Sequence, residues 1–176
     1  MKDARAAFGS PFVFALFCAR GTIQRMKIAL GADHAGFELK ELLKEHIEKS
    51  GHQVKDMGTD GAASVDYPDF ARSVAHDVAK HDSDFGVLVC GSGVGMAISA
   101  NKVAGIRAAN VGNEQAARLS REHNNANVLA LGARVVREPD AIKIVDAFLN
   151  TPFAGGRHER RVEKIAQMEK EEKSSG

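Results

Sequence analysis

One stretch of the chain, Phe85–Cys90 (FGVLVC), most constrains how it can fold, because it is apolar without interruption and leads into a glycine-rich turn. Uninterrupted apolar runs of this length are typical of strands covered on both faces, as in parallel sheets. Parallel strands need long connections, and the chain supplies amphipathic segments with helical spacing, as in Ala35–Ser50. The sequence therefore predicts strands that alternate with helices.

This alternation continues along the chain, and its length of 176 residues fits one domain at about 100–200 residues per domain. The fold class is therefore α/β: a single Rossmann-like (flavodoxin-like) domain, whose five-stranded parallel sheet has helices on both faces. The expected strands are Lys27–Gly31, Gln53–Met57, Phe85–Cys90, Ile106–Val111 and Val128–Leu131. The expected helices are Ala35–Ser50, Asp69–Lys80, Val94–Val103, Glu114–Glu122, Asp140–Leu149 and one that starts at about His158.

Charge and composition exclude several classes of function. The chain has 24 Lys and Arg against 23 Asp and Glu, a net charge of +1, so no nucleic-acid partner is expected. The longest apolar run, Phe12–Ala19, is far shorter than the ~20 residues of a membrane span, so no membrane partner is expected. Cys18 and Cys90 form no Cys-x-x-Cys pair, which fits a reducing compartment and a cytoplasmic location.

The two ends of the chain differ from its body. Residues 1–25 carry basic residues and a short apolar stretch, but Phe17 is bulky where signal cleavage needs a small residue. We expect an N-terminal extension, either disordered or a mis-assigned start, because Met26 leads directly into the first strand. Residues 26–168 are the expected domain, and residues 169–176 are expected to form a charged C-terminal tail with a frayed helix end.

Ligands of parallel α/β folds bind at the carboxyl ends of the strands. The turn Cys90–Gly95 (CGSGVG) occupies such an end, and its glycines leave backbone N–H groups open to a phosphate or a developing oxyanion. Thiols near helix N-termini ionise readily, which suits Cys90 to act as a general base. Asp33-His34 and Arg134 follow two other strands. The alternative is a buried structural cysteine in a tightly packed turn.

A second group of candidate residues follows helices instead of strands. If helical, Arg157 and Arg161 share one face, and two guanidiniums without a matching acid suit a phosphate. His123-Asn124 precede the strand at residues 128–131, and such connections lie at the edge of the sheet opposite the carboxyl ends. These residues can therefore serve Cys90 only from a second subunit, which predicts a dimer with shared active sites. The alternatives are a helix cap at His123 and a solvated helix face at the arginines.

A set of motifs extends, in order, over residues 26–168. They are KIALGADHAGF from Lys27, DYPD from Asp66, CGSGVG from Cys90, ANK from Ala100, GIRA from Gly105, SREHN from Ser120, NVLALGAR from Asn127 and GGRH from Gly155. Together they resemble type B ribose-5-phosphate isomerases, a family that includes allose- and galactose-6-phosphate isomerases. The resemblance implies that residues 26–168 form a sugar-phosphate isomerase domain.

The implied reaction is the reversible isomerisation of ribose 5-phosphate and ribulose 5-phosphate through an enediolate, without a metal or cofactor. The resemblance makes Cys90 the base and Ser92 its assistant, and it makes His123 the acid that opens the sugar ring with help from Asp33. The implied substrate-binding residues are Asp33, His34, Tyr67, Gly91, Ser92, Gly93, Val94, Gly95, Asn124, Arg134, Arg157 and Arg161. Some members of the family carry a Glu base just after the glycine turn, where this chain has Met96.

The implied partners are a sugar phosphate and further copies of the chain, as a homodimer or a dimer of dimers. Three alternatives remain open. The first is an isomerase of a six-carbon sugar phosphate such as allose or galactose 6-phosphate, and the second is a non-catalytic phosphosugar-binding module. The third is a metal-dependent isomerase with Asp33, His34 and His123 as ligands, although no pair of ligands has helical metal spacing.

Overall fold

The structure, a computed structural model, describes residues 25–174. The expected extension at residues 1–25 lies, except for Arg25, outside the described residues. In chain order the elements are β1 (Lys27–Ala32), α1 (Phe37–Lys49), β2 (Gln53–Asp56), α2 (Tyr67–Ala79), β3 (Phe85–Cys90), α3 (Val94–Ala100), β4 (Ala108–Asn110), α4 (Glu114–Asn124), β5 (Val128–Gly132), α5 (Glu138–Asn150), a 3-10 turn (Gly156–His158) and α6 (Glu159–Ser174). None of the described helices is long and apolar enough to cross a membrane.

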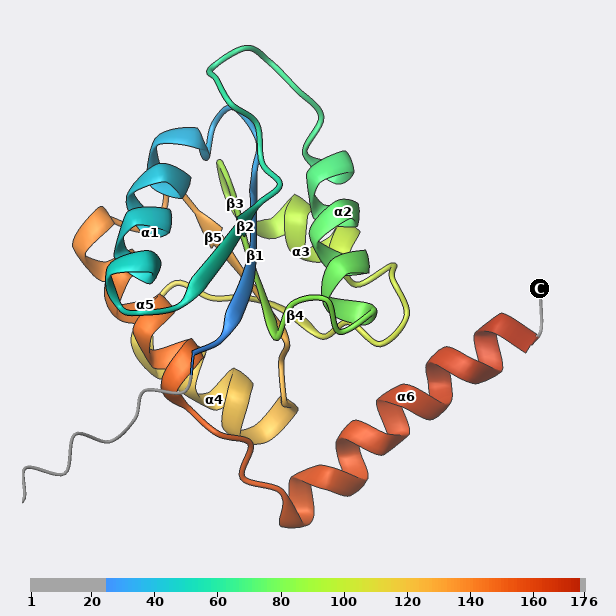
Figure 1. Ribbon diagram of the computed structural model, residues 1–176. Coiled ribbons are helices and arrows are strands. Elements are labelled where there is room, and N and C mark those ends of the chain that lie inside the picture. The colour runs from blue at the N-terminus through green and yellow to red at the C-terminus, as the bar shows by residue number, and fades with distance from the viewer. Residues whose placement is uncertain (1–24, 175–176) are drawn as a thin grey trace, which may run out of the picture.

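The five strands form one parallel sheet in the order β2-β1-β3-β5-β4. β3 lies at the centre, where Val89 is paired with Ala32 of β1 and Cys90 with Gly132 of β5. Helices α1 and α5 cover one face of the sheet, and α2 and α3 cover the other (Figure 1). The predicted fold class is therefore confirmed, with the carboxyl ends of β1, β3 and β5 side by side.

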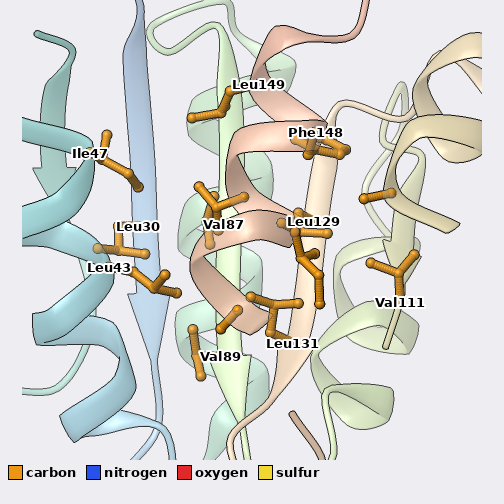
Figure 2. Packing of buried hydrophobic residues seen from close by; sticks show 14 of the residues in the cluster. Leu30, Leu43, Ile47, Val87, Val89, Val111, Leu129, Leu131, Phe148 and Leu149 are labelled. Carbon is orange, nitrogen blue, oxygen red and sulfur yellow. The ribbon is translucent and has the colours of Figure 1, made fainter. Parts of the chain in front are cut away.

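Alternate residues of the central strands supply two apolar cores, because successive side chains of a strand point to opposite faces. On the face of α1 and α5, Leu30, Val87 and Leu129 come from three neighbouring strands and meet helix residues that include Leu43 and Phe148 (Figure 2). On the other face, Leu88 packs with Val74 of α2 and Met96 of α3. Burial of each such side chain stabilises the fold by about 1.5–3 kcal/mol, so β3 is held rigidly on both faces.

Two expected boundaries were wrong around β4. Helix α3 ends at Ala100 instead of Val103, because the next residues form turns that end at Gly105, whose φ is +79°. β4 is only three residues long instead of six, because it is an edge strand that pairs with β5 alone. Before it, the Arg107 N–H donates to the Asn127 side chain at 2.8 Å, and the Arg107 carbonyl accepts the Asn127 N–H at 3.2 Å.

Helix α6 is longer than the expected frayed end, since it continues through residues 169–174 of the predicted tail. It has no buried residue and projects away from the body of the domain (Figure 1). Near its end, the carboxylate of Glu169 accepts the Gly105 N–H at 2.9 and 3.0 Å. This contact ties α6 to the turn that precedes β4.

Candidate active site

A cleft of about 660 Å³ opens at the carboxyl ends of β1, β3 and β5. This is the edge of the sheet at which the sequence places the glycine-rich turn. The cleft is lined by Asp33, His34, Ala35, Tyr67, Cys90, Gly91, Ser92, Val94, Gly95, Ile98, Arg134 and Val135.

Cys90 is the last residue of β3, and its residue surface is only 4% exposed. It is a free cysteine, and its sulfur accepts a hydrogen bond from the Gly93 N–H at 3.2 Å. A donor aimed at sulfur stabilises a thiolate more than a thiol, because the anion is the stronger acceptor. The sulfur thus borders the cleft with a hydrogen-bond donor directed at it.

The turn after Cys90 adopts a shape that requires glycine. Gly93 has a φ of +78°, and a Cβ there would lie 2.8 Å from the Leu131 carbonyl carbon. A Cβ on Gly132 would lie 2.7 Å from the backbone of Ser92, so β5 also requires a glycine where the turn crosses it. Two backbone bonds fix the turn: Ala133 N–H donates to the Cys90 carbonyl at 2.8 Å and Arg134 N–H to that of Gly91 at 3.0 Å.

The backbone N–H groups of this turn divide into two sets. Gly93 donates to the Cys90 sulfur, and Val94 donates to the Ser92 hydroxyl at 3.4 Å. Within the described part of the chain, the N–H groups of Gly91, Ser92 and Gly95 have no acceptor. The anion cradle expected from all five amides is therefore narrower, and these three N–H groups remain open to an oxygen anion.

Asp33 and His34 follow β1 and form one wall of the cleft. One carboxylate oxygen of Asp33 accepts the N–H groups of Ala35 and Gly36, each at 3.0 Å, which fixes the turn. The ring of His34 accepts the Val65 N–H at Nδ1 at 3.3 Å. A neutral ring that accepts at Nδ1 carries its proton on Nε2, and so His34 has a donor for a ligand.

Tyr67 and Arg134 stand over the glycine turn. Tyr67 begins α2, and its ring packs so closely that a Cβ on Gly95 would lie 2.7 Å from it. The exposed Arg134 side chain lies over Gly91, 3.6 Å from where a Cβ would be. Arg134 forms no ion pair within residues 25–174, so its charge is available to an anion.

Five predicted site residues do not line this cleft. Gly93 belongs to the turn but directs its N–H at the Cys90 sulfur, and the other four are His123, Asn124, Arg157 and Arg161. Helix α4 ends at Asn124 near the start of α6, at the end of the sheet where β1 begins (Figure 1). The His123 ring stacks on that of His158, with centroids 4.2 Å apart and planes 5° apart. Arg157 Nε donates to His158 Nε2 at 3.4 Å. We call these four residues and His158 the His123 cluster.

Arg157 and Arg161 give the His123 cluster positive charge. Burial, followed by the nearby charges of His123, Arg157 and Arg161, lowers the pKa of His158 below its ordinary value. His158 is therefore uncharged near neutral pH, which lets it accept a hydrogen bond from Arg157. Both guanidiniums are exposed and form no ion pair within the described residues, so this end of the sheet presents two cations to an anionic group.

A buried arginine supports the His123 cluster from behind. Arg121 is 7% exposed, and its Nη1 donates to the Asn125 side chain at 2.9 Å and to the Ala126 carbonyl at 2.5 Å. Its Nε donates to the Thr151 carbonyl at 3.3 Å, and its guanidinium lies 4.6 Å from the Phe85 ring centroid. Arg121 thereby joins the end of α4 to the end of α5, the two segments that lead to His123 and Arg157.

Comparison with known proteins decides the family. The family model described as Ribose/Galactose Isomerase matches residues 28–165. The chain belongs to the ribose/galactose isomerase family. The family and the aldose–ketose isomerase class predicted from the motifs are therefore confirmed.

Curated members of the family support this assignment. The probable ribose-5-phosphate isomerase B of Mycoplasma genitalium is 49% identical over 146 residues, which cover 82% of this chain and 96% of that protein. Ribose-5-phosphate isomerase B of Escherichia coli K12 is 49% identical over 143 residues, which cover 81% of this chain and 96% of that protein.

Solved structures of the family agree with the fold. Ribose-5-phosphate isomerase B of Clostridium thermocellum matches with a TM-score of 0.82 and 51% identity, over 83% of this chain and 99% of that one. The enzyme from Mycoplasma genitalium with bound ribulose-5-phosphate matches with a TM-score of 0.80 and 48% identity, over 82% of this chain and 97% of that one.

In this member of the family, the structure separates the predicted site residues into two sets, as the parallel topology led us to expect. Sequence reasoning missed the apolar residues at the rim of the cleft, Ile98 and Val135, and the two residues that support the His123 cluster, His158 and Arg121. The GGRH and SREHN motifs were the available signals for these supports. Within residues 25–174, no group of three or more His, Cys, Asp or Glu side chains is arranged to hold a metal ion.

Proposed function

We propose that this protein interconverts ribose 5-phosphate and ribulose 5-phosphate, with Cys90 as the base. The observation that carries the proposal is the Cys90 sulfur, which borders a cleft beside three N–H groups that have no acceptor within the described residues. The family provides the substrate, since its relatives are named for this sugar phosphate and one structure contains ribulose-5-phosphate.

The proposed proton transfer uses groups that lie at the glycine turn. The Cys90 thiolate takes the proton from C2 of the open-chain aldose, and the electron pair moves through the C1–C2 bond onto the carbonyl oxygen. The open N–H groups of Gly91, Ser92 and Gly95 stabilise that enediolate oxygen. The Cys90 thiol then returns the proton to C1, while the hydroxyl proton moves from O2 to O1 with Ser92 assisting. Met96 is fully buried and has no proton to exchange.

The remaining steps need the His123 cluster. His123 opens the sugar ring with help from Asp33, while Tyr67 and Asn124 contact the sugar. The phosphate is bound by Arg157 and Arg161 together with His34 and Arg134, because guanidiniums form paired hydrogen bonds to phosphate. Binding energy from the phosphate, which does not react, orients the reacting carbons.

We infer that the working enzyme is a homodimer or a dimer of dimers in which the Cys90 cleft of one copy meets the His123 cluster of another. The two clusters belong to opposite ends of the sheet, and a single small sugar phosphate cannot contact both within one chain. The rim of the cleft supports the inference, because Val94, Ile98 and Val135 are 49%, 57% and 69% exposed. Exposed apolar side chains around a polar cleft are typical of a protein–protein interface.

Cys90 also bears on the location of the enzyme. A base thiol must stay reduced, and Cys90 is a free cysteine. Thiols stay reduced in the cytoplasm and become oxidised in secreted proteins, so we place the enzyme in the cytoplasm.

The decisive experiment measures kcat/KM on ribose 5-phosphate, allose 6-phosphate and galactose 6-phosphate, with the Cys90→Ser variant as control. We expect a preference for ribose 5-phosphate of about tenfold or more, because extra substrate atoms must fit the same cleft. In D2O, the native protein should place deuterium on the isomerised carbon, and Cys90→Ser should not. A protein that binds these sugars without turning them over would be a binding module, and the proposal would then be wrong.

A further inference from the structure

Asn110 lies behind the glycine turn and outside the cleft. It is the last residue of the edge strand β4. Its side-chain amide nitrogen donates to the Ala130 carbonyl at 3.1 Å and to the Ser92 carbonyl at 3.4 Å. Both partners are carbonyl oxygens, so the nitrogen of the amide must face them. Asn110 therefore holds the turn by the carbonyl of Ser92.

The peptide that joins Ser92 to Gly93 transmits this contact to Cys90. A trans peptide is planar, and its C=O and N–H groups point in opposite directions. The carbonyl of this peptide faces Asn110, and its N–H, that of Gly93, donates to the Cys90 sulfur at 3.2 Å. The three groups form one hydrogen-bonded chain from Asn110 to the sulfur, in which each bond polarises the next.

This peptide needs such a restraint because of the glycine that follows it. Glycine adopts positive and negative φ with similar ease, so a peptide beside Gly93 can rotate at little cost. A rotated peptide would turn the Ser92 carbonyl toward the sulfur and repel a thiolate. Among the described residues, Asn110 is the hydrogen-bond donor to that carbonyl. Its amide also fills the space beside Gly93, where a Cβ would overlap the Asn110 nitrogen.

We propose that Asn110 is a positioning residue for Cys90: by holding the Ser92 carbonyl, it aims the Gly93 N–H at the sulfur. The effect on the sulfur is independent of any reaction. Its consequence for turnover rests on the proposed function, in which Cys90 is the base.

The test replaces Asn110 by Leu, which keeps the size and removes the donor, and by Ala, which keeps the strand and removes the side chain. Alkylation of Cys90 by iodoacetamide is followed across the pH range by mass spectrometry of the peptide that contains it, so that Cys18 does not interfere. Near neutral pH we expect alkylation to slow about three- to tenfold, the effect of losing one hydrogen bond to a charged group. The rate at high pH, where the thiol is fully ionised, should be unchanged.

Asn101→Leu is the matched control. Asn101 is also exposed, and its side-chain amide also bonds backbone of β4, at 2.8 Å to the Ala108 N–H and at 2.9 Å to the Ala108 carbonyl. None of these bonds leads to Cys90. Asn101→Leu should therefore lower the Tm, as measured by circular dichroism, while the pH profile of Cys90 alkylation should match that of the native protein.

The outcomes separate this proposal from the proposed function. If both Asn110 variants keep the native alkylation profile, the positioning role is wrong. If the profile moves to higher pH and kcat falls with it while KM is kept, both proposals are supported. If the profile moves and turnover does not, Asn110 positions the sulfur and Cys90 is not the base. Should Asn110→Leu fail to fold, Asn110→Ala decides by the same criteria.

Discussion

The two ends of the sheet present different chemical groups: backbone N–H groups at one end and side chains at the other. At the carboxyl end, the cleft around Cys90 is shaped by backbone: a glycine turn, three open N–H groups and the ends of buried strands. At the other end, the His123 cluster consists of side chains, with two stacked imidazoles and two exposed guanidiniums. The cleft has backbone donors in fixed positions and one arginine, Arg134, whereas the cluster has two arginines whose side chains are exposed. Proton transfer needs the first property and anchoring of a phosphate needs the second.

The largest expected effect is the loss of turnover when one functional side chain is removed at either end of the sheet. Cys90→Ser and His123→Ala should each reduce kcat by about a hundredfold or more, as is typical when a general base or acid is removed. Circular dichroism should show a native fold for both. Near-normal turnover of Cys90→Ser would contradict its role as the base.

Mixing two inactive variants, Cys90→Ala and His123→Ala, then tests whether the two ends of the sheet work together across subunits. After Cys90→Ala and His123→Ala chains have exchanged subunits, each hybrid dimer contains one site with both functional ends, so about a quarter of the native activity should return. Mass spectrometry of the intact assemblies verifies the exchange. Hybrid dimers without activity would mean that the two ends do not form a shared site.

The next effect is confined to substrate binding. Arg157→Ala should raise KM for ribose 5-phosphate by about 10- to 100-fold, the usual cost of losing a charge-assisted hydrogen bond to phosphate, with a smaller change in kcat. Arg160→Ala removes an exposed arginine from the neighbouring position in the helix and is the matched control. An unchanged KM for Arg157→Ala would place the phosphate elsewhere.

Arg121→Met tests whether the two ends of the sheet are independent. It removes hydrogen bonds that support the His123 cluster and none at the Cys90 cleft. Loss of the bonds to Asn125, Ala126 and Thr151 should lower the free energy of unfolding by about 2–3 kcal/mol, measured by urea titration. Activity should fall with it, while alkylation of Cys90 should keep its native rate. Altered alkylation would show that the two ends are mechanically coupled.

The smallest effect is a dependence of stability on pH. Because the pKa of His158 is lowered in the fold, the unfolded chain binds more protons just below the ordinary value of 6.5. Stability from this group is therefore complete above that value and is lost as the pH falls below it. The Tm of the native protein should drop between about pH 7.5 and about pH 5.5, and His158→Gln should drop less. Equal drops would assign the dependence to other groups.

The sequence predicted the Cys90 end better than the His123 end, for a physical reason. A buried strand and its glycine turn are continuous in the chain, so their pattern of residues specifies both the local structure and the position at the sheet edge. The opposite placement of His123 also followed from topology, because parallel strands force helix-to-strand connections to that edge. Motifs added the family, which the pattern of strands and helices alone could not supply.

What the sequence could not predict depends on contacts between distant residues. Asn110 bonds carbonyls 18 and 20 positions away, and Arg121 bonds one 30 positions away. Backbone carbonyls are present at every residue, so no residue type marks these partners. β4 was overestimated for a related reason, since its edge position limits its pairing to one neighbour.

The Cys90 cleft and the His123 cluster lie at opposite ends of one sheet, and this has a consequence for a newly made chain. Under the shared-site proposal, a solitary copy carries the Cys90 sulfur and Arg134 in its cleft but lacks the second copy's Arg157 and Arg161, which complete the binding of the phosphate. Turnover would then begin only when copies meet, so specific activity should decline on dilution below the dissociation constant of the assembly. Assembly itself would act as the switch that starts the enzyme.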